Sequence, residues 1–412
     1  MKVLYFHLHF SIPNGPGGIR SYAMAQCLVE RGHEVTMVCG SHLLSNTGLD
    51  SHFLNGQRRG LVNGIEVVEF DLTYSNSDSF LKRISVFFKY VFRALILVFT
   101  EKYDLVFATT TPLTTSIPGI AARWLRAKPF IFEVRDLWPE LPKAMGVIKN
   151  PLILYMMSIL EWASYHSANH LIALSPGIAK GIQKRGIKPE SVTLIPNGCD
   201  LDIFNDRAKK WRPKGIKNND LLVLFAGSHG PANGLNSVLD VAAELKHRGR
   251  HDIKFLLVGD GKLKPTLMSR ASNEQLDNVL FHEPINKMKL AGLMQATDIG
   301  LQILANVPAF YYGTSPNKFF DYISAGLPVL NNYPGWLSEM IIKNNCGFCV
   351  PPENINAFAD ALEKAANDPS ALIIKGINAK RLAIENFDRK VQASNWVDVV
   401  ELSFKIWKEA KL

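Results

Sequence analysis

The sequence lacks paired cysteines, low-complexity tracts and any apolar run long enough to cross a membrane. Its five cysteines are an odd number scattered over 412 residues, which favours a reducing compartment over a disulfide scaffold. Cys346 and Cys349 have no second cysteine pair or nearby histidines, so we interpret them as small apolar residues of a turn, not as zinc ligands. The amino-terminal residues show no signal-peptide pattern, and we expect a globular protein without one.

Signatures of nucleic-acid binding are also missing, although the chain has a net charge of +9. There is no aromatic RNA-binding pattern, helix-turn-helix or zinc finger, so we expect no nucleic-acid partner. Residues 80–102 (FLKRISVFFKYVFRALILVFTEK) place Lys82, Arg83, Lys89 and Arg93 in a strongly apolar helix. This pattern suits the plane of an anionic membrane surface. The alternative is an ordinary helix that packs on a sheet with its charges in water.

The length and the alternation of apolar runs with helical stretches predict two domains with parallel sheets. The first half predicts strands at 3–10, 34–39, 65–70, 105–108, 129–133 and 170–173, and helices at 18–31, 80–100, 115–126 and 151–166. The second half predicts strands at 221–226, 253–258, 279–281, 299–303 and 328–331, and helices at 235–247, 264–272, 287–296 and 317–324.

We therefore expect an α/β fold with two Rossmann-like domains that face a deep cleft. The expected boundaries are an amino-terminal domain at 1–205, a polar linker at 206–220 and a carboxy-terminal domain at 221–386. Helices at 387–412 have an apolar stripe with which they could cross back to the first domain. Ligands of open parallel sheets bind at the carboxyl ends of the strands, which directs attention to the loops there.

The bend NGPGGIR at 14–20 lies between an apolar strand and a helix, where exposed backbone N–H groups can face a phosphate or a sugar. It does not match the dinucleotide fingerprint, because Arg20 stands where the third glycine should be and no acid follows the next strand. It is not a Walker loop either, since no Gly-Lys-Ser/Thr follows. A turn that needs glycine for structural reasons alone is the other interpretation.

Several further stretches give the chain a specific resemblance. In chain order they are FEVRDLWPE (132–140), LSPGIAKGI (174–182), IPNGCDLDIF (195–204), LFAGSHGPANGL (224–235), LLVGDGKLKPTL (256–267), VLFHEPINKMKLAGLMQATDIGL (279–301), SPNKFFDYISAGLPVL (315–330) and CGFCVPPEN (346–354). With the bend, they resemble the retaining nucleotide-sugar glycosyltransferases of family 4, which have the GT-B fold. The combination of 136–140 with 315–322 resembles the bacterial O-antigen and capsule branch, which includes proposed N-acetyl-L-fucosamine transferases.

The resemblance implies a donor site that departs from the family pattern. Ser228 and Asn233 replace the arginine and lysine of the loop that stabilises the leaving diphosphate. The resemblance makes Lys318 the compensating cation, because a lysine and a helix N-terminus can act on the same phosphate. Asp321 takes the position of the ribose-binding carboxylate. The expected donor-binding residues are Gly17, Gly18, Arg20, Gly227, Ser228, His229, His282, Glu283, Ser315, Asn317, Lys318 and Asp321.

Acceptor-side candidates lie at the end of the predicted strand at 129–133 and directly after it. They are Glu133, Arg135, Asp136 and Glu140. Asp136 is the leading candidate to orient or deprotonate the acceptor hydroxyl, and it is the expected catalytic residue together with Lys318. Arg20 and Arg135 are further candidate cations for the diphosphate. We expect no metal and no other cofactor, because the lysine and helix N-terminus replace the cation.

The expected function is transfer of a sugar, with retention, from a nucleotide diphosphate to an undecaprenyl-diphosphate-linked saccharide in O-antigen, capsule or related polysaccharide synthesis. The donor implied is a UDP-N-acetylamino sugar such as UDP-N-acetyl-L-fucosamine. We expect a cytoplasmic enzyme that is peripheral on the inner face of the plasma membrane. The alternatives are a nucleotide-sugar 2-epimerase of the same architecture and a catalytically silent partner in a glycan assembly complex.

Overall fold

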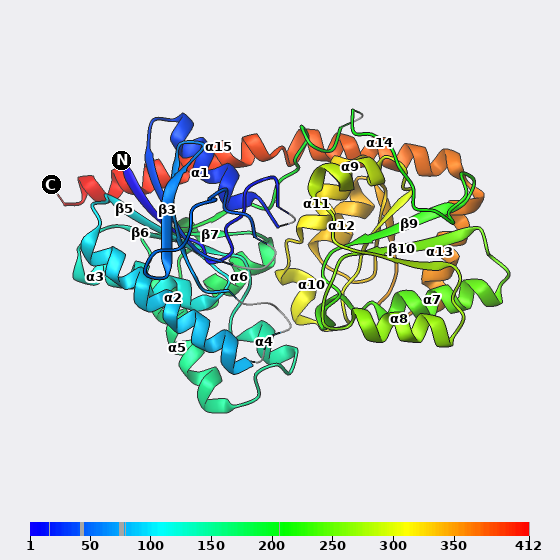
Figure 1. The fold of residues 1–412 in the computed structure, drawn as a ribbon, viewed down its shortest axis with the longest axis horizontal. Helices are drawn as coiled ribbons and strands as arrows, with labels where there is room; N and C mark the ends of the chain where they lie inside the picture. Colours follow the sequence, from blue (N-terminus) through cyan, green and yellow to red (C-terminus); the bar gives the residue numbers. More distant parts are fainter. Residues whose placement is uncertain (16, 42–44, 74–77, 79, 206, 412) are drawn as a thin grey trace. The chain divides into compact units, whose positions relative to one another are not determined.

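The structure is a computed structural model that describes residues 1–15, 17–41, 45–73, 78, 80–205 and 207–411. Residue 16 of the bend and residue 206 of the expected linker lie outside the described residues. The chain divides into two compact units (Figure 1). The first unit contains Met1–Asn197, Tyr312–Ser315 and Lys390–Leu412, and the second contains Gly198–Tyr311 and Pro316–Arg389.

The described part of the first unit is built on one sheet with the strand order β3-β4-β2-β1-β5-β6-β7-β8. Its strands are β1 (Lys2–Phe6), β2 (Glu34–Gly40), β3 (Gln57–Val62), β4 (Ile65–Phe70), β5 (Leu105–Thr109), β6 (Phe130–Val134), β7 (His170–Ala173) and β8 (Val192–Leu194). Only the β3–β4 pairing among these described strands is antiparallel. The carboxyl ends of β1, β5 and β6 therefore meet along one edge of the sheet.

Helices cover both faces of the first sheet (Figure 1). They are α1 (Arg20–Glu30), α2 (Phe80–Thr100), α3 (Ser116–Leu125), α4 (Glu140–Ala144), α5 (Pro151–Ser167), α6 (Pro176–Gln183) and the greater part of α15 (Arg389–Glu409). The face under α1 and α15 buries Trp396, whose indole stacks on the Tyr5 ring at 5.9 Å. The opposite face packs under α2, α3, α5 and α6. Burial of β1, β5 and β6 on both faces explains their nearly continuous apolar sequence.

The described part of the second unit is a parallel sheet with the order β11-β10-β9-β12-β13-β14. The strands are β9 (Leu221–Ala226), β10 (Ile253–Val258), β11 (Val279–His282), β12 (Ile299–Gln302), β13 (Val329–Asn331) and β14 (Gly347–Cys349). The helices are α7 (Asn236–His247), α8 (Lys264–Asn273), α9 (Lys287–Met294), α10 (Ala309–Gly313), α11 (Asn317–Ser324), α12 (Trp336–Lys343), α13 (Ile355–Asn367) and α14 (Pro369–Asn386). The apolar core lies around β9, β10 and β12.

Two Rossmann-like α/β units confirm the predicted fold class. The division between them differs from the expected boundary at 205, because packing separates the units after Asn197. The expected linker 206–220 belongs to the second unit, where the indole of Trp211 donates to the Lys289 carbonyl at 2.8 Å and Arg212 donates to the Ala296 carbonyl. The segment 390–412 of the expected crossing helices packs within the first unit.

None of the helices among the described residues contains a stretch that is long and apolar enough to cross a membrane.

Candidate functional site

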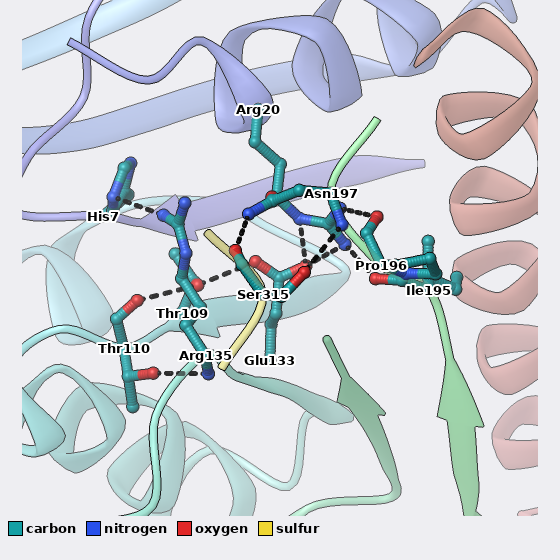
Figure 2. Close-up of polar contacts among 10 residues, drawn as sticks. All are labelled: His7, Arg20, Thr109, Thr110, Glu133, Arg135, Ile195, Pro196, Asn197 and Ser315. Atoms are coloured by element: carbon teal, nitrogen blue, oxygen red, sulfur yellow. Dashed lines mark hydrogen bonds and ion pairs between the residues drawn. The ribbon is translucent and has the colours of Figure 1, made fainter. Parts of the chain in front are cut away.

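Three loops meet at the carboxyl ends of β1, β5 and β6 in the first unit (Figure 2). His7 directly follows β1, Thr110 follows β5 and Arg135 follows β6. The backbone N–H of Arg135 donates to the Thr110 hydroxyl at 2.8 Å, and its guanidinium reaches the His7 imidazole at 3.2 Å. The sequence prediction included Arg135 at this edge, whereas His7 was not a candidate.

Arg20 and Glu133 form a buried ion pair beside this edge, and both are fully buried. Two nitrogens of the Arg20 guanidinium donate to Glu133 Oε2 at 3.0 and 2.8 Å, and the carbonyls of Ile195 and Pro196 accept from the same guanidinium. Burial alone would raise the pKa of Glu133, but Arg20 and Arg135 outweigh it and hold this pKa below its ordinary value. Arg20, a predicted donor-binding residue, thus pairs with Glu133, a predicted acceptor-side residue. Each charge has its counter-ion inside the first unit.

The other candidates of the first unit lie at its surface loops. Gly17 and Gly18 lie in the loop that precedes α1, and both are partly exposed. Asp136 is partly exposed next to Arg135. Burial raises the pKa of Asp136, although Arg135 and a hydrogen bond with Thr111 act in the opposite direction. A carboxylate with a raised pKa is a better proton acceptor than an ordinary one, so the environment of Asp136 suits a general base. Glu140 is exposed at the first position of α4.

Ser315 packs in the first unit although Pro316 and its successors belong to the second. Its hydroxyl accepts from the backbone N–H of Asn197 at 3.3 Å, and its carbonyl accepts from the Asn197 side-chain amide at 2.6 Å (Figure 2). Nearby, the Ser175 hydroxyl donates to the Tyr312 carbonyl at 3.1 Å. Ser315 therefore has protein partners that the sequence prediction of a donor contact did not include.

In the second unit, Lys318 lies in the first turn of α11 beside the end of β9. Its ammonium donates to the side-chain oxygen of Asn233 at 2.7 Å and lies 4.2 Å from the centre of the Phe225 ring. Gly227 is so close that an added Cβ would lie 3.2 Å from Lys318 Cε. Burial lowers the pKa of Lys318 to about 7, and no carboxylate of the described residues pairs with its ammonium. A desolvated cation without a counter-ion is prepared for an anionic ligand.

His229 is fully buried in the loop after β9, between the rings of Phe225 and Phe281. Burial lowers the pKa of His229 to about 4, with the positive charge of Lys264 acting in the same direction. The imidazole is therefore neutral at physiological pH, and neither ring nitrogen has a hydrogen-bond partner in the described part of the chain. Ser228 is exposed in the same loop, where its carbonyl accepts from the Asn233 amide at 2.8 Å.

Asp321 lies one turn after Lys318 but is buried in a network of four charges. Lys287 donates to Asp321 at 3.0 Å and to Asp200 at 2.6 Å, and Arg389 also donates to Asp200. Burial raises the pKa of Asp321 although Lys287 lowers it, whereas Arg389 and Lys287 overcome burial and lower the pKa of Asp200. The predicted ribose carboxylate therefore also holds a buried lysine.

The remaining donor-side candidates are at the end of β11 and the start of α11. Glu283 is exposed and pairs with Lys264 at 2.7 Å. His282 lies against Trp211, with ring centres 5.6 Å apart, and one ring nitrogen donates to the Glu283 carbonyl. Asn317 is the first residue of α11 and is partly exposed. Within the described ranges, no three His, Cys, Asp or Glu side chains gather closely enough to hold a metal ion.

Several residues of these sites were not predicted, among them His7 and Lys287, and the hydrogen bond between Asn233 and Lys318 was not predicted either. The position of His7 directly after an apolar strand was a usable signal, but the strand was predicted to continue to residue 10, whereas it ends at Phe6. Lys287 begins a predicted helix, but nothing in the sequence connects it with Asp321. Asn233 occupies a position where the family has a lysine, and the structure shows it as a partner of Lys318.

Comparison with known proteins identifies both units. Residues 16–203 match Glycosyltransferase Family 4, and residues 206–382 match Glycosyl transferases group 1. The chain is 26% identical over 215 residues to a D-inositol 3-phosphate glycosyltransferase of Gordonia bronchialis, a match that covers 48% of this chain and 44% of that relative.

A second relative is the UDP-Gal:alpha-D-GlcNAc-diphosphoundecaprenol alpha-1,3-galactosyltransferase of Escherichia coli, with 24% identity over 302 residues, 70% of this chain and 72% of the relative. Among solved structures, sucrose-phosphate synthase from Thermosynechococcus elongatus superposes with a TM-score of 0.76, at 18% identity, over 98% of this chain and 99% of that chain. The fold is thus the GT-B fold, and the chain belongs to the GT-B glycosyltransferases, with a family 4 domain followed by a group 1 domain.

Proposed function

We propose that this glycosyltransferase moves a sugar, with retention, from a UDP-sugar to an undecaprenyl-diphosphate-linked saccharide during O-antigen, capsule or related polysaccharide synthesis. The observation that carries the proposal is the desolvated ammonium of Lys318 beside Gly227 and the start of α11. Negative charge grows on the departing diphosphate in the transition state, so a pre-positioned cation stabilises it. The retaining outcome rests on the family, as does the absence of a metal requirement.

The uridine nucleotide and the lipid carrier are supported by one relative. The name of the Escherichia coli transferase contains both UDP and diphosphoundecaprenol. The basic pair missing from the 227–234 loop makes Lys318 the main cation of the donor site in this proposal. A UDP-N-acetylamino sugar, including UDP-N-acetyl-L-fucosamine, is the donor that we place first in a test.

A lipid-linked acceptor requires access to a membrane surface, and the first unit exposes two apolar helices. On α2, five large apolar side chains are exposed: Leu81, Phe88, Phe92, Ile96 and Phe99. On α5, which contacts α3 beside α2, five more are exposed: Leu152, Tyr155, Met156, Ile159 and Trp162. Lys82 and Lys89 are exposed on α2, whereas Arg93 turns inward to the Gly56 carbonyl and the Phe70 ring.

We therefore propose that α2 and α5 lie on the anionic cytoplasmic face of the plasma membrane, with their aromatic side chains in the interface. Flotation with phosphatidylglycerol vesicles tests this. Serine at both Phe88 and Phe92 should release the protein from vesicles, and so should serine at both Tyr155 and Trp162. A matched control replaces Ile373 and Ile377, which are 65% and 55% exposed on α14, and should leave vesicle binding unchanged. Equal loss in the control would contradict the proposal.

The decisive experiment is a UDP-release screen of the purified protein against a panel of UDP-sugars with a synthetic lipid-diphosphate saccharide. Release that depends on the acceptor, and is abolished by Lys318→Ala, is the expected result. Interconversion of the nucleotide sugar without acceptor would favour an epimerase, and failure to bind any UDP-sugar in calorimetry would favour a silent partner. Asp321→Ala is a poor probe of ribose binding, because it leaves the buried Lys287 with one carboxylate fewer.

A further inference from the structure

The contact between His7 and Arg135 crosses the strand end where a sheet of this type binds ligands. β5 lies between β1 and β6 in the sheet, so the Arg135 side chain extends over the end of β5 to reach the residue after β1. Its backbone is fixed at the same place by the hydrogen bond to Thr110 (Figure 2). Arg135 is therefore held at two points, its backbone N–H and its guanidinium.

The protonation state of His7 follows from its partner. An arginine keeps its proton and only donates, so Nε2 of His7 accepts from Arg135 and the ring proton is on Nδ1. His7 is 3% exposed, and burial together with the neighbouring Arg135 holds its pKa well below the ordinary value. Nδ1 has no hydrogen-bond partner in the described part of the chain. His7 is thus a neutral acceptor that holds the guanidinium of Arg135.

Among the described residues, no carboxylate is in ion-pair contact with the positive charge of Arg135. Glu133 is the nearest buried acid of β6, but Arg20 occupies its Oε2 and the Thr109 hydroxyl donates to its Oε1 at 2.9 Å. No carboxylate among the described residues forms an ion pair with Arg135. The side chain is partly exposed, and a guanidinium has five N–H donors in a fork that matches phosphate oxygens. Donors therefore remain for an anionic ligand.

We propose that Arg135 binds the diphosphate of the lipid-linked acceptor and that His7 is the residue that positions it. The proposal rests on the proposed function. Asp136, the candidate base for the acceptor hydroxyl, is the next residue in the chain, so the anion and the hydroxyl of one acceptor molecule would meet adjacent side chains. The donor diphosphate has its own cation, Lys318, in the second unit. The acceptor unit thus contributes a second, separate phosphate-binding cation.

Calorimetry with two probes tests this on the full-length protein. Geranyl diphosphate represents the acceptor and UDP represents the donor. Both should bind together without competition. Arg135→Leu should weaken the binding of geranyl diphosphate at least about tenfold, which is the loss expected for a charge-assisted hydrogen bond. The affinity for UDP should stay unchanged. Lys318→Ala should weaken the binding of UDP and leave the affinity for geranyl diphosphate unchanged. The affinity for geraniol, which lacks the diphosphate, should be the same in Arg135→Leu as in the native protein.

His7 is tested with a matched pair of substitutions. His7→Leu removes the acceptor of the Arg135 hydrogen bond and should weaken geranyl diphosphate, whereas His7→Gln supplies an amide oxygen and should restore most of the binding. Adding His7→Leu to Arg135→Leu should have no further effect, because the two residues act as one unit. Arg135→Lys keeps the charge and loses the fork, and it should bind with intermediate affinity.

The outcomes separate the two proposals. If UDP binding depends on Lys318 but the affinity for geranyl diphosphate does not change in Arg135→Leu, this inference is wrong and the proposed function stands. Competition between the two probes, or loss of UDP binding in Arg135→Leu, would also overturn it, since Arg135 would then serve the donor. If UDP binding does not depend on Lys318, the proposed donor site fails instead.

Discussion

Raising the pH from 7 to 8 should weaken UDP binding about fivefold, because Lys318 loses its proton in this interval. Burial lowers the pKa of Lys318 from 10.5 to about 7 in the ligand-free protein. About half of the molecules then carry the charge at pH 7 and roughly one in eleven at pH 8. A bound diphosphate needs the charged form and raises this pKa, so binding takes up a proton and becomes weaker as the pH rises.

Other titrations do not imitate this effect. His229, with a pKa of about 4, stays neutral throughout. The terminal phosphate of UDP has its second pKa at about 6 and is mostly ionised above pH 7. The effect of Lys318 on folding has the opposite sign: the unfolded chain holds this proton up to about pH 10.5 and the folded chain only to about 7, so between these values the folded state gains stability as the pH rises.

The assay is UDP affinity by calorimetry at pH 7, 7.5 and 8 at constant ionic strength. Lys318→Arg is the matched control, because arginine keeps its charge and its affinity for UDP should stay flat over this range. Lys318→Met should bind weakly at every pH. An affinity of the native protein that is constant or rises with pH would refute the assignment of Lys318 as the donor cation.

Three further predictions concern named side chains. Asp136→Asn should lower kcat by about 10²- to 10⁴-fold, the usual contribution of a general base, while the Kd for UDP is unchanged; a normal kcat would remove Asp136 from catalysis. Glu133→Gln should cost about 3–5 kcal/mol of stability in denaturant unfolding, because Arg20 is left buried and unpaired, and a double change to Met at Arg20 and Leu at Glu133 should recover part of it. Trp396→Ala should cost about 3–5 kcal/mol in the same assay, and a loss below about 1 kcal/mol would show that α15 does not complete the first core.

The sequence was sufficient for the fold class and for most elements, because buried parallel strands have nearly continuous apolar runs. The helix Asn317–Ser324 and the strand Leu221–Ala226 were predicted with their observed bounds, and these two elements hold Lys318 beside the end of β9. The strand Gln57–Val62 was not predicted, since its charged sequence QRRGLV is that of an edge strand with one partner.

Partners far apart in the chain could not be predicted from local patterns. Arg20 and Glu133 are 113 residues apart, and their pairing depends on the order of strands in the sheet. Lys287 and Asp321 meet for the same kind of reason. A charged residue in a glycine-rich bend suggests a ligand when only the neighbouring residues are known, whereas the fold can give it a buried counter-ion instead.

The location of α15 has a consequence for how the protein is made. The first unit is interrupted after Asn197 and regains its last segment only at Lys390. At a synthesis rate of 5–20 residues per second, the ribosome needs roughly 10–40 s to produce the ~190 residues in between. Throughout this time α15 is missing from the face of the first sheet that it shares with α1, so the apolar surface that Trp396 covers is not yet buried. The amino-terminal half should therefore finish folding after the carboxy-terminal half, and nascent chains stopped before residue 390 should depend on chaperones to stay soluble.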